Sequence, residues 1–184
     1  MKFKQIFIFL FTVFFFFSCS SFKDVPGRKK VKFDTYGYEV LNGKYELYFG
    51  EELKPSLNKG LFLKTELDEI EENRSSNYIE IQVLNEKRIE ARLYIEDKIV
   101  EKRRLKGKFK DNYFVLKKRR EFKLAYVLLN LYGTEKNRLF LNPDGDLVVD
   151  SESGGCGLFV FFPVFCAGSE KYDRIYARIK DDLE

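Results

Sequence analysis

The sequence predicts an all-β domain, or a β-rich domain with a minor helix, built from antiparallel strands. Short segments that alternate apolar and polar residues recur at spacings of about ten residues, turn residues separate them, and no strongly amphipathic helix interrupts the pattern. Such a meander closes into a β-barrel or a sandwich. The barrel is slightly favoured because closure removes the exposed strand edges.

The N-terminal residues differ from the rest of the chain. Lys2 and Lys4 precede an unbroken apolar run from Ile6 to Phe17, and Ser18-Cys19 follow. A short basic segment, an apolar segment of about 7–15 residues and a small residue are the layout of a secretory signal. The run is too short for a membrane-spanning helix, which needs about 20 apolar residues. We therefore predict a signal peptide over residues 1–18.

The end of this segment, Phe17-Ser18-Cys19, resembles a bacterial lipoprotein box. The phenylalanine-rich run before it, with Phe16 where Leu is usual, is similar to lipoprotein signals of the Bacteroidota type. The resemblance implies acylation of Cys19 and attachment to a membrane of the cell envelope. It also implies the outer membrane of a Gram-negative bacterium, with the protein facing the periplasm or the exterior. The alternatives are an uncleaved anchor and an ordinary signal followed by a free cysteine.

Residues 19–35 are polar and typical of a tether between a bilayer and a folded domain. The favoured interpretation of the basic residues here is a solvated linker, and the alternative is contact with anionic headgroups. These residues are Arg28, Lys29, Lys30 and Lys32. The remaining residues, 36–184, have the length of a single β-rich domain.

The domain begins with two aromatic segments on either side of Asn42-Gly43. Residues 36–41 and 44–49 are rich in strand-forming residues, so Asn-Gly between them predicts a tight hairpin. The alternative is one strand that bends at Gly43. Gly43-x-Tyr45 weakly resembles the Gly-x-Trp element on the first strand of lipocalin-type barrels. That resemblance implies a barrel that binds an apolar ligand.

Residues 50–77 carry the weakest pattern. Leu61-Phe62-Leu63 predicts one short strand. The acidic cluster that follows lacks the spacing of a calcium-binding loop, so a frayed helical turn or a solvated loop is favoured. Its members are Glu66, Asp68, Glu69, Glu71 and Glu72.

The alternation is clearest over residues 78–116. Apolar residues recur at every second position from Ile79 to Val83, from Ile89 to Ile95 and from Leu105 to Phe109. Polar turns separate these strands, with Asp111-Asn112 as the last turn before residues 113–116. Period-two alternation of this kind indicates antiparallel strands with one face exposed to water.

Residues 122–132 are favoured as a continuation of the meander because of their β-branched and aromatic content, although a helix packed on the sheet is the alternative. Strands over 138–141 and 147–149 follow, with Asn142-Pro143-Asp144-Gly145 as the turn between them.

One candidate site is a basic surface on the strands that end near residue 119. Its proposed members, which could meet lipid phosphate or an acidic polysaccharide, are Lys106, Lys108, Lys110, Lys117 and Arg119. The favoured interpretation is a solvated sheet face, because lysines commonly protect sheets from aggregation. Neighbouring glutamates could also neutralise the charge.

The second candidate site is the apolar segment between Cys156 and Cys166. Of the three cysteines in the chain, these two are left to pair if Cys19 carries lipid, and an exported protein is in an oxidising compartment. The favoured interpretation is a buried strand pair with stapled ends, and the alternative is an apolar tip for a membrane or a partner. Its candidate contact residues are Phe159, Phe161, Phe162 and Phe165.

The composition bounds the function. The chain has no histidine, which excludes Ser/His and Cys/His catalysis, and no carboxylate pair is singled out for glycosidase chemistry. We expect no enzyme activity, no cofactor and no metal. The nearly balanced charge argues against nucleic-acid binding. The sequence predicts non-enzymatic binding of a protein partner or an apolar ligand at the membrane surface. The alternative is a structural or protective envelope protein, such as an immunity factor.

Overall fold

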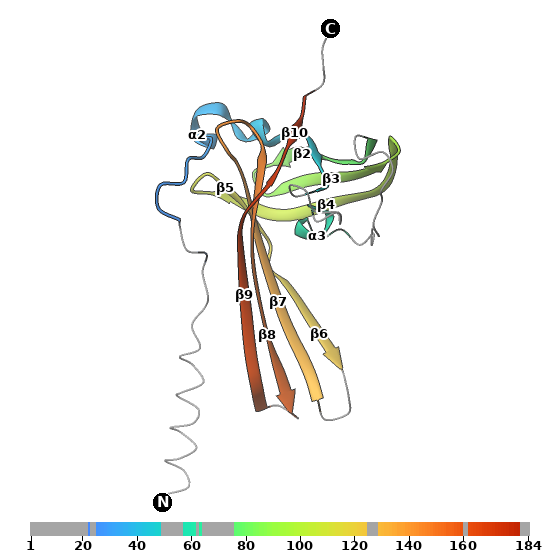
Figure 1. Cartoon of the computed structure of the whole chain (residues 1–184), viewed down its shortest axis with the longest axis vertical. Coiled ribbons are helices and arrows are strands. Elements are labelled where there is room, and N and C mark those ends of the chain that lie inside the picture. The colour runs from blue at the N-terminus through green and yellow to red at the C-terminus, as the bar shows by residue number, and fades with distance from the viewer. Residues whose placement is uncertain are drawn as a thin grey trace, which may run out of the picture.

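The computed structural model describes residues 22, 25–48, 57–61, 63, 76–124, 129–159 and 162–180. It confirms a β-rich fold, which consists mostly of one large antiparallel sheet with short helices (Figure 1). The helical elements are α2 (Phe33–Tyr36), η1 (Tyr38–Leu41) and α3 (Leu57–Gly60). The strands are β1 (Gly43–Glu46), β2 (Tyr78–Asn85), β3 (Arg88–Ile95), β4 (Lys98–Lys110), β5 (Tyr113–Leu116), β6 (Arg119–Leu124), β7 (Leu129–Leu141), β8 (Leu147–Phe159), β9 (Phe162–Tyr176) and β10 (Arg178–Ile179).

The sheet has the order β10-β1-β2-β3-β4-β5-β7-β8-β9, and β6 pairs with β7 beside this path. It is not closed into the barrel that the strand pattern suggested. The two ends of the path, β9 and β10, are consecutive in sequence, with Ala177 between them. The backbone N–H of Glu46 on β1 donates to the carbonyl of Ala177 at 3.0 Å. The sheet therefore curls around its core. Its first and last strands in the spatial order, β10 and β9, are separated only by Ala177.

The molecule has two parts, a head and an arm, which share three strands. The head contains the N-terminal segment, β1 to β5, β10 and the ends of β7, β8 and β9 next to them. The arm is a four-stranded extension formed by β6 (119–124) and by residues 129–136 of β7, 151–159 of β8 and 162–171 of β9. Figure 1 shows these strands leaving the head side by side, with no other described element along them.

The core lies in the head. Its largest cluster is made of Leu, Ile, Val, Ala, Tyr and Phe side chains from α2, η1, α3, β1 to β5 and the head ends of β7, β8 and β9. The alternation predicted for residues 78–109 is confirmed, because Ile79, Ile89 and Leu93 have no exposed surface and Leu105 has 5%. The predicted turn at Asp111-Asn112 is also confirmed, and both residues have the positive φ that a tight hairpin requires.

The predicted hairpin around Asn42-Gly43 is wrong. The first segment forms α2 and η1, and Gly37 separates them with φ +80, a conformation that interrupts a strand. Tyr38 stacks on Phe109 of β4 at 4.2 Å between ring centroids, and Phe33 meets the same ring edge-on at 5.2 Å. These long-range contacts override the local strand preference. The second segment forms only the short strand β1.

The short strand predicted at Leu61-Phe62-Leu63 is also wrong for the described residues, because Leu61 follows directly on α3. Leu57, Leu61 and Leu63 nevertheless point into the core, with at most 6% of their surface exposed. The apolar signal was real, but it marks a buried helical turn. The acidic cluster over residues 66–72 lies outside the described residues.

Residues 122–132 are β on both sides of an undescribed segment, as favoured, and not helical where they are described. β6 ends at Leu124 and β7 begins at Leu129. The predicted turn over 142–145 is confirmed, with Gly145 at φ +90 and its N–H donating to the carbonyl of Asn142 at 3.0 Å.

Arg178 on β10 fixes this short strand to η1 and β1. Its guanidinium donates to the backbone carbonyls of Val40, at 3.3 Å, and of Asn42, and it lies over the ring of Tyr45 at 5.8 Å. Tyr45 is fully buried and donates its hydroxyl to the carbonyl of Leu41 at 2.9 Å. Burial raises the pKa of this phenol to about 12.

Candidate functional site

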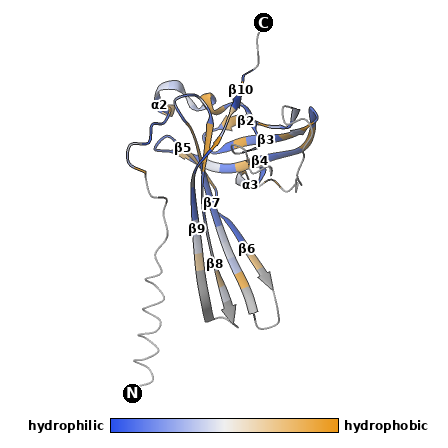
Figure 2. Cartoon of the chain, in the orientation of Figure 1, coloured by the Kyte–Doolittle hydropathy of each residue, from blue (hydrophilic) through white to orange (hydrophobic). Residues whose placement is uncertain are grey.

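The arm carries a gradient of residue types along its length. Four cross-strand rows at its far end hold most of its apolar residues, and we call the described residues of these rows the arm tip. They are residues 122–124, 129–132, 156–159 and 162–166. Figure 2 shows hydrophobic positions on these strands well away from the head. The arm therefore presents apolar sequence at a distance from the core that would normally bury it.

Two apolar side chains of the arm tip are exposed. Phe122 on β6 has 58% of its surface exposed, and Leu131 on β7 has 38%. Phe122 lies opposite Tyr132 in the ladder, and directly opposed residues share one face of a sheet. Leu131 precedes Tyr132 in the same strand, so it faces the other side. Each face of the arm tip thus exposes at least one large apolar side chain.

The predicted phenylalanine cluster lies on this tip. Phe159 is the last residue of β8, Phe162 is the first residue of β9, and the two are paired in the ladder. Phe165 is opposite Gly157, while Phe161 lies outside the described residues. The structure therefore places the described members of the cluster in the strands of a hairpin and not in a loop.

Cys156 and Cys166 are directly opposite each other in the β8–β9 ladder. Opposed Cα atoms in antiparallel strands are about 4.5–5.5 Å apart, which is within the range of about 4.4–6.8 Å that a disulfide spans. They belong to the row that also contains Phe122 and Tyr132.

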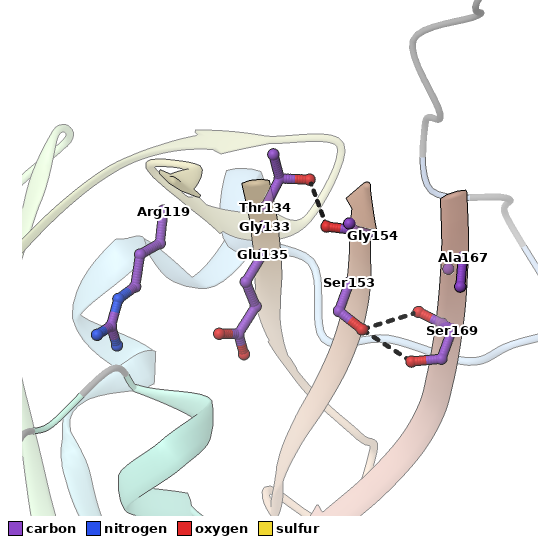
Figure 3. Close-up of a pocket in the computed structure, with 10 residues that line it drawn as sticks. Arg119, Gly133, Thr134, Glu135, Ser153, Gly154, Ala167 and Ser169 are labelled. Atoms are coloured by element: carbon purple, nitrogen blue, oxygen red, sulfur yellow. Dashed lines mark hydrogen bonds between the residues drawn. The ribbon is translucent and has the colours of Figure 1, made fainter. Parts of the chain in front are cut away.

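A belt of small residues crosses the middle of the arm. In successive ladder rows, Gly133 pairs with Gly155, and Gly154 pairs with Gly168. Together with neighbouring residues they line a shallow hollow of about 420 Å³ (Figure 3). At its edge the hydroxyls of Ser153 and Ser169 are 2.7 Å apart.

The side chains around this hollow offer little chemistry. Thr134 donates its hydroxyl to the carbonyl of Gly154 at 3.4 Å, and the Arg119 and Glu135 side chains lie toward the same side in Figure 3. Within the described ranges, no group of three or more acidic, cysteine or histidine residues is placed to hold a metal ion. The hollow is therefore a surface of small residues, bordered by the basic side chain of Arg119 and the acidic side chain of Glu135.

A buried ion-paired cluster lies where the arm joins the head. Asp150 of β8 has no exposed surface, and its carboxylate accepts hydrogen bonds from Arg28 at 2.5 Å and from Arg138 at 2.8 Å. Its second oxygen accepts the backbone N–H of Asp173 at 3.0 Å. Arg28 also pairs with the Asp173 carboxylate at 2.7 Å. We call these four residues the neck cluster.

The neck cluster fixes the N-terminal segment to the head. The Arg28 side chain is only 7% exposed. After it, Lys30 donates to the Tyr113 hydroxyl at 2.7 Å and the N–H of Val31 donates to the carbonyl of Leu141 at 3.0 Å. The solvated-linker interpretation is therefore wrong for Arg28 and Lys30. The sequence did carry a signal for this site, because Asp150 ends the apolar run Leu147-Val148-Val149.

The predicted basic surface is divided between the two parts. Lys106, Lys108 and Lys110 are exposed on alternate positions of β4, and the N–H of Lys117 donates to the carbonyl of Lys106 at 2.8 Å. Arg119, in contrast, begins β6 and borders the hollow of the arm. Lys110 has an acidic neighbour, Asp111, at 3.6 Å.

Two neighbouring cations of β4, Lys102 and Arg104, pair with Glu90 of β3, as the sequence suggested glutamates could do. Glu90 is 2% exposed and binds Lys102 at 3.1 Å, Arg104 at 3.3 Å and Arg92 at 2.6 Å. Burial alone would raise the pKa of this carboxyl, but hydrogen bonds from the three cations lower it to about 2. This part of the surface is therefore an ion-pair network centred on one buried carboxylate.

No protein-family model, curated protein or solved structure matches this chain. None of the described helices is long and apolar enough to cross a membrane.

Proposed function

We propose that this protein is a non-enzymatic, lipid-anchored protein of the cell envelope, and that its arm is the element that binds at the membrane surface. The single observation that carries the proposal is the arm itself. Its strands extend beyond the core, and they leave Phe122 58% and Leu131 38% exposed. Apolar surface held away from a core is typical of an interaction site.

The packed interior of the head favours binding on the outside of the molecule and argues against an apolar ligand carried inside it. The side chains of Tyr45, Phe114 and Tyr176 fill the interior together with many Leu and Ile residues, and all three are fully buried. The faint lipocalin-type element, Gly43 and Tyr45 on β1, is part of this packed core. The head therefore acts as the scaffold that positions the arm.

The anchor is tested by the mass of the intact protein extracted from membranes. We expect the chain to begin at Cys19 and to carry the added mass of acyl chains, and we expect Cys19→Ala to remain unprocessed and unacylated. An identical mass shift in the two proteins would remove the anchor from the proposal.

The arm is tested by trypsin treatment of isolated envelopes and of the detergent-purified protein. If the arm is the binding element, cleavage after Arg120 is slower in envelopes, whereas cleavage after Lys106 and Lys108 of the head is unchanged. Equal cleavage of arm and head in both preparations would show that the arm is not covered in the envelope.

We also propose a disulfide between Cys156 and Cys166, which would hold β8 and β9 together at the arm tip. Closing the intervening loop, residues 157–165, contributes about 2–3 kcal/mol in the chain-entropy model. Peptide mapping with and without reductant tests the pairing. Finding both thiols free to alkylation in the unreduced, exported protein would exclude it.

A further inference from the structure

The N-terminal segment and the arm start from the same place. Arg28 and Asp150 are in direct contact in the neck cluster, at 2.5 Å. The chain continues from Arg28 back toward Cys19, and β8 continues from Asp150 along the arm. The contact gives the two segments a common origin, so the distances that they can cover from it can be compared.

The N-terminal segment stays close to the neck, whereas the arm extends away from it. The Arg138 guanidinium lies 4.6 Å over the Phe22 ring, and the N–H of Arg28 donates to the carbonyl of Val25 at 3.4 Å, so the chain turns between Val25 and Arg28. Cys19 precedes Phe22 by three positions, which an extended chain covers in at most about 11 Å. A strand rises about 3.3 Å per residue, so the nine positions from Asp150 to Phe159 take β8 about 30 Å from the neck. The anchor and the arm tip therefore contact one bilayer when the arm is inclined toward the membrane surface.

The arm tip also has the residue pattern of a bilayer-facing element. Phe122 and Leu131 are exposed on opposite faces of the sheet, so an apolar medium that surrounds the tip covers both, whereas a protein docked on one face covers only one. Arg120 is exposed two positions before Phe122, on the same face. Tyr132 lies opposite Phe122. Tyrosine and arginine next to an apolar surface are typical of the boundary between water and lipid.

We propose that the arm tip lies in the surface layer of the same phospholipid bilayer that holds the acyl chains of Cys19. This rests on the lipid anchor in the proposed function. The lipid and the arm tip are then two contacts with one membrane, and the neck cluster holds them at a fixed relation.

The chain has no tryptophan, so one introduced tryptophan reports on its own surroundings. The test uses the processed, lipidated full chain, reconstituted into vesicles of phosphatidylethanolamine and phosphatidylglycerol with or without brominated acyl chains. Phe122→Trp places the reporter on the arm tip. Ile99→Trp, at a position that is 55% exposed on β4, is the matched control on the head. We expect brominated lipid to quench most of the emission of Phe122→Trp and to leave Ile99→Trp unchanged.

A second substitution probes the other face of the arm tip. Adding Leu131→Glu to Phe122→Trp should abolish the quenching, because a carboxylate on the tip resists entry into lipid. Val100→Glu, at a head position that is 49% exposed, should leave the quenching intact. Quenching that survives Leu131→Glu would overturn insertion of both faces.

Vesicle flotation separates this inference from the proposed function. Protein that floats with the vesicles while Phe122→Trp stays unquenched keeps its anchor, and the arm tip is then left for a protein partner, which overturns the inference. Protein that neither floats nor carries lipid contradicts the anchor, and the inference fails with it. Flotation together with quenching confined to the arm tip supports both.

Discussion

The head and the arm are built partly from the same three strands, yet different interactions hold them together. In the head, β7 contributes Leu139, Phe140 and Leu141, none of which is more than 1% exposed. A few residues earlier in the same strand, Gly133 and Thr134 lie in the belt of small residues on the arm. Side-chain burial stabilises the head, whereas the described middle of the arm depends mainly on backbone hydrogen bonds between strands.

This difference shows that a strand can continue its backbone pairing well beyond the core that its other end helps to form. The ladder between β7 and β8 runs without a register shift from Leu129–Phe159 to Leu141–Leu147, while the core cluster ends in the head. The neck cluster marks the boundary, since β8 and β9 change register between Val149 and Ser151. Substitutions in the head should therefore act on global stability, and those in the arm mainly on binding.

The largest expected effect is at the boundary itself. Asp150→Asn removes the carboxylate that the Arg28 and Arg138 guanidiniums share, and it leaves two cations with side chains only 7% and 5% exposed without their main anionic partner. Breaking a buried ion pair on one side costs about 3–5 kcal/mol. We expect a loss of this size in the free energy of unfolding, measured by urea denaturation.

The control is Asp173→Asn, which removes the other acidic partner of Arg28. Its side chain is 56% exposed, and exposed ion pairs contribute only about 0–1 kcal/mol. Equal losses for the two variants would show that the neck cluster is not a buried structural feature.

A leucine pair compares the two parts directly. Leu93→Ala in the head removes a fully buried side chain and should cost about 2–5 kcal/mol. Leu131→Ala on the arm removes one that is 38% exposed, and surface changes are usually within about 0.5 kcal/mol. Urea midpoints of the two variants measure the difference. A large loss for Leu131→Ala would mean that the arm has a core of its own.

A glycine pair makes the same comparison at the level of the backbone. A Cβ on Gly107 of β4 would lie 2.6 Å from the Phe114 ring and 2.6 Å from the carbonyl oxygen of Val115. Gly107→Ala should therefore cost about 1–3 kcal/mol through overpacking. A Cβ on Gly154 of the arm meets nothing closer than 3.8 Å. Gly154→Ala should be neutral or stabilise by up to about 1 kcal/mol, since it restricts the unfolded chain. Calorimetric unfolding of both variants tests this, and the reverse order would contradict it.

Within the head, the sequence predicted residues 78–116 better than residues 36–41 for a local reason. Residues 78–116 alternate with a period of two and are separated by polar turns, so each strand carries its own evidence of one buried face. The structure of residues 36–41, in contrast, depends on contacts with distant parts of the chain. They have the composition of a strand, but Gly37 and the stacking of Tyr38 on Phe109 make them helical. No local pattern contains a contact with a residue that lies about seventy positions away in the sequence.

The candidate site was predictable in composition but not in position. The phenylalanines between Cys156 and Cys166 suggested an apolar tip as the alternative to a buried strand pair. That this hairpin projects from the head, and that it is joined by a second hairpin carrying Phe122 and Leu131, depends on the pairing of β6 with β7. The register that brings Arg28 to Asp150, across more than a hundred residues, was likewise invisible in the sequence.

The smallest expected effect concerns pH and the charge network on the outer face of the head. The pKa of Glu90 is lowered to about 2 in the folded protein, whereas an unfolded glutamate titrates near about 4.3. Between these values the unfolded chain binds more protons, so the contribution of Glu90 to stability is complete above the higher pKa and is lost as the pH falls toward the lower one. Wild type should therefore exceed Glu90→Gln in stability at pH 6 by more than it does at pH 3, as measured by urea midpoints.

Gly154→Ala on the arm leaves this network intact and should lose as much stability as wild type over the same range. A constant difference between wild type and Glu90→Gln at the two pH values would exclude ionised Glu90 as the group that ties β3 to β4.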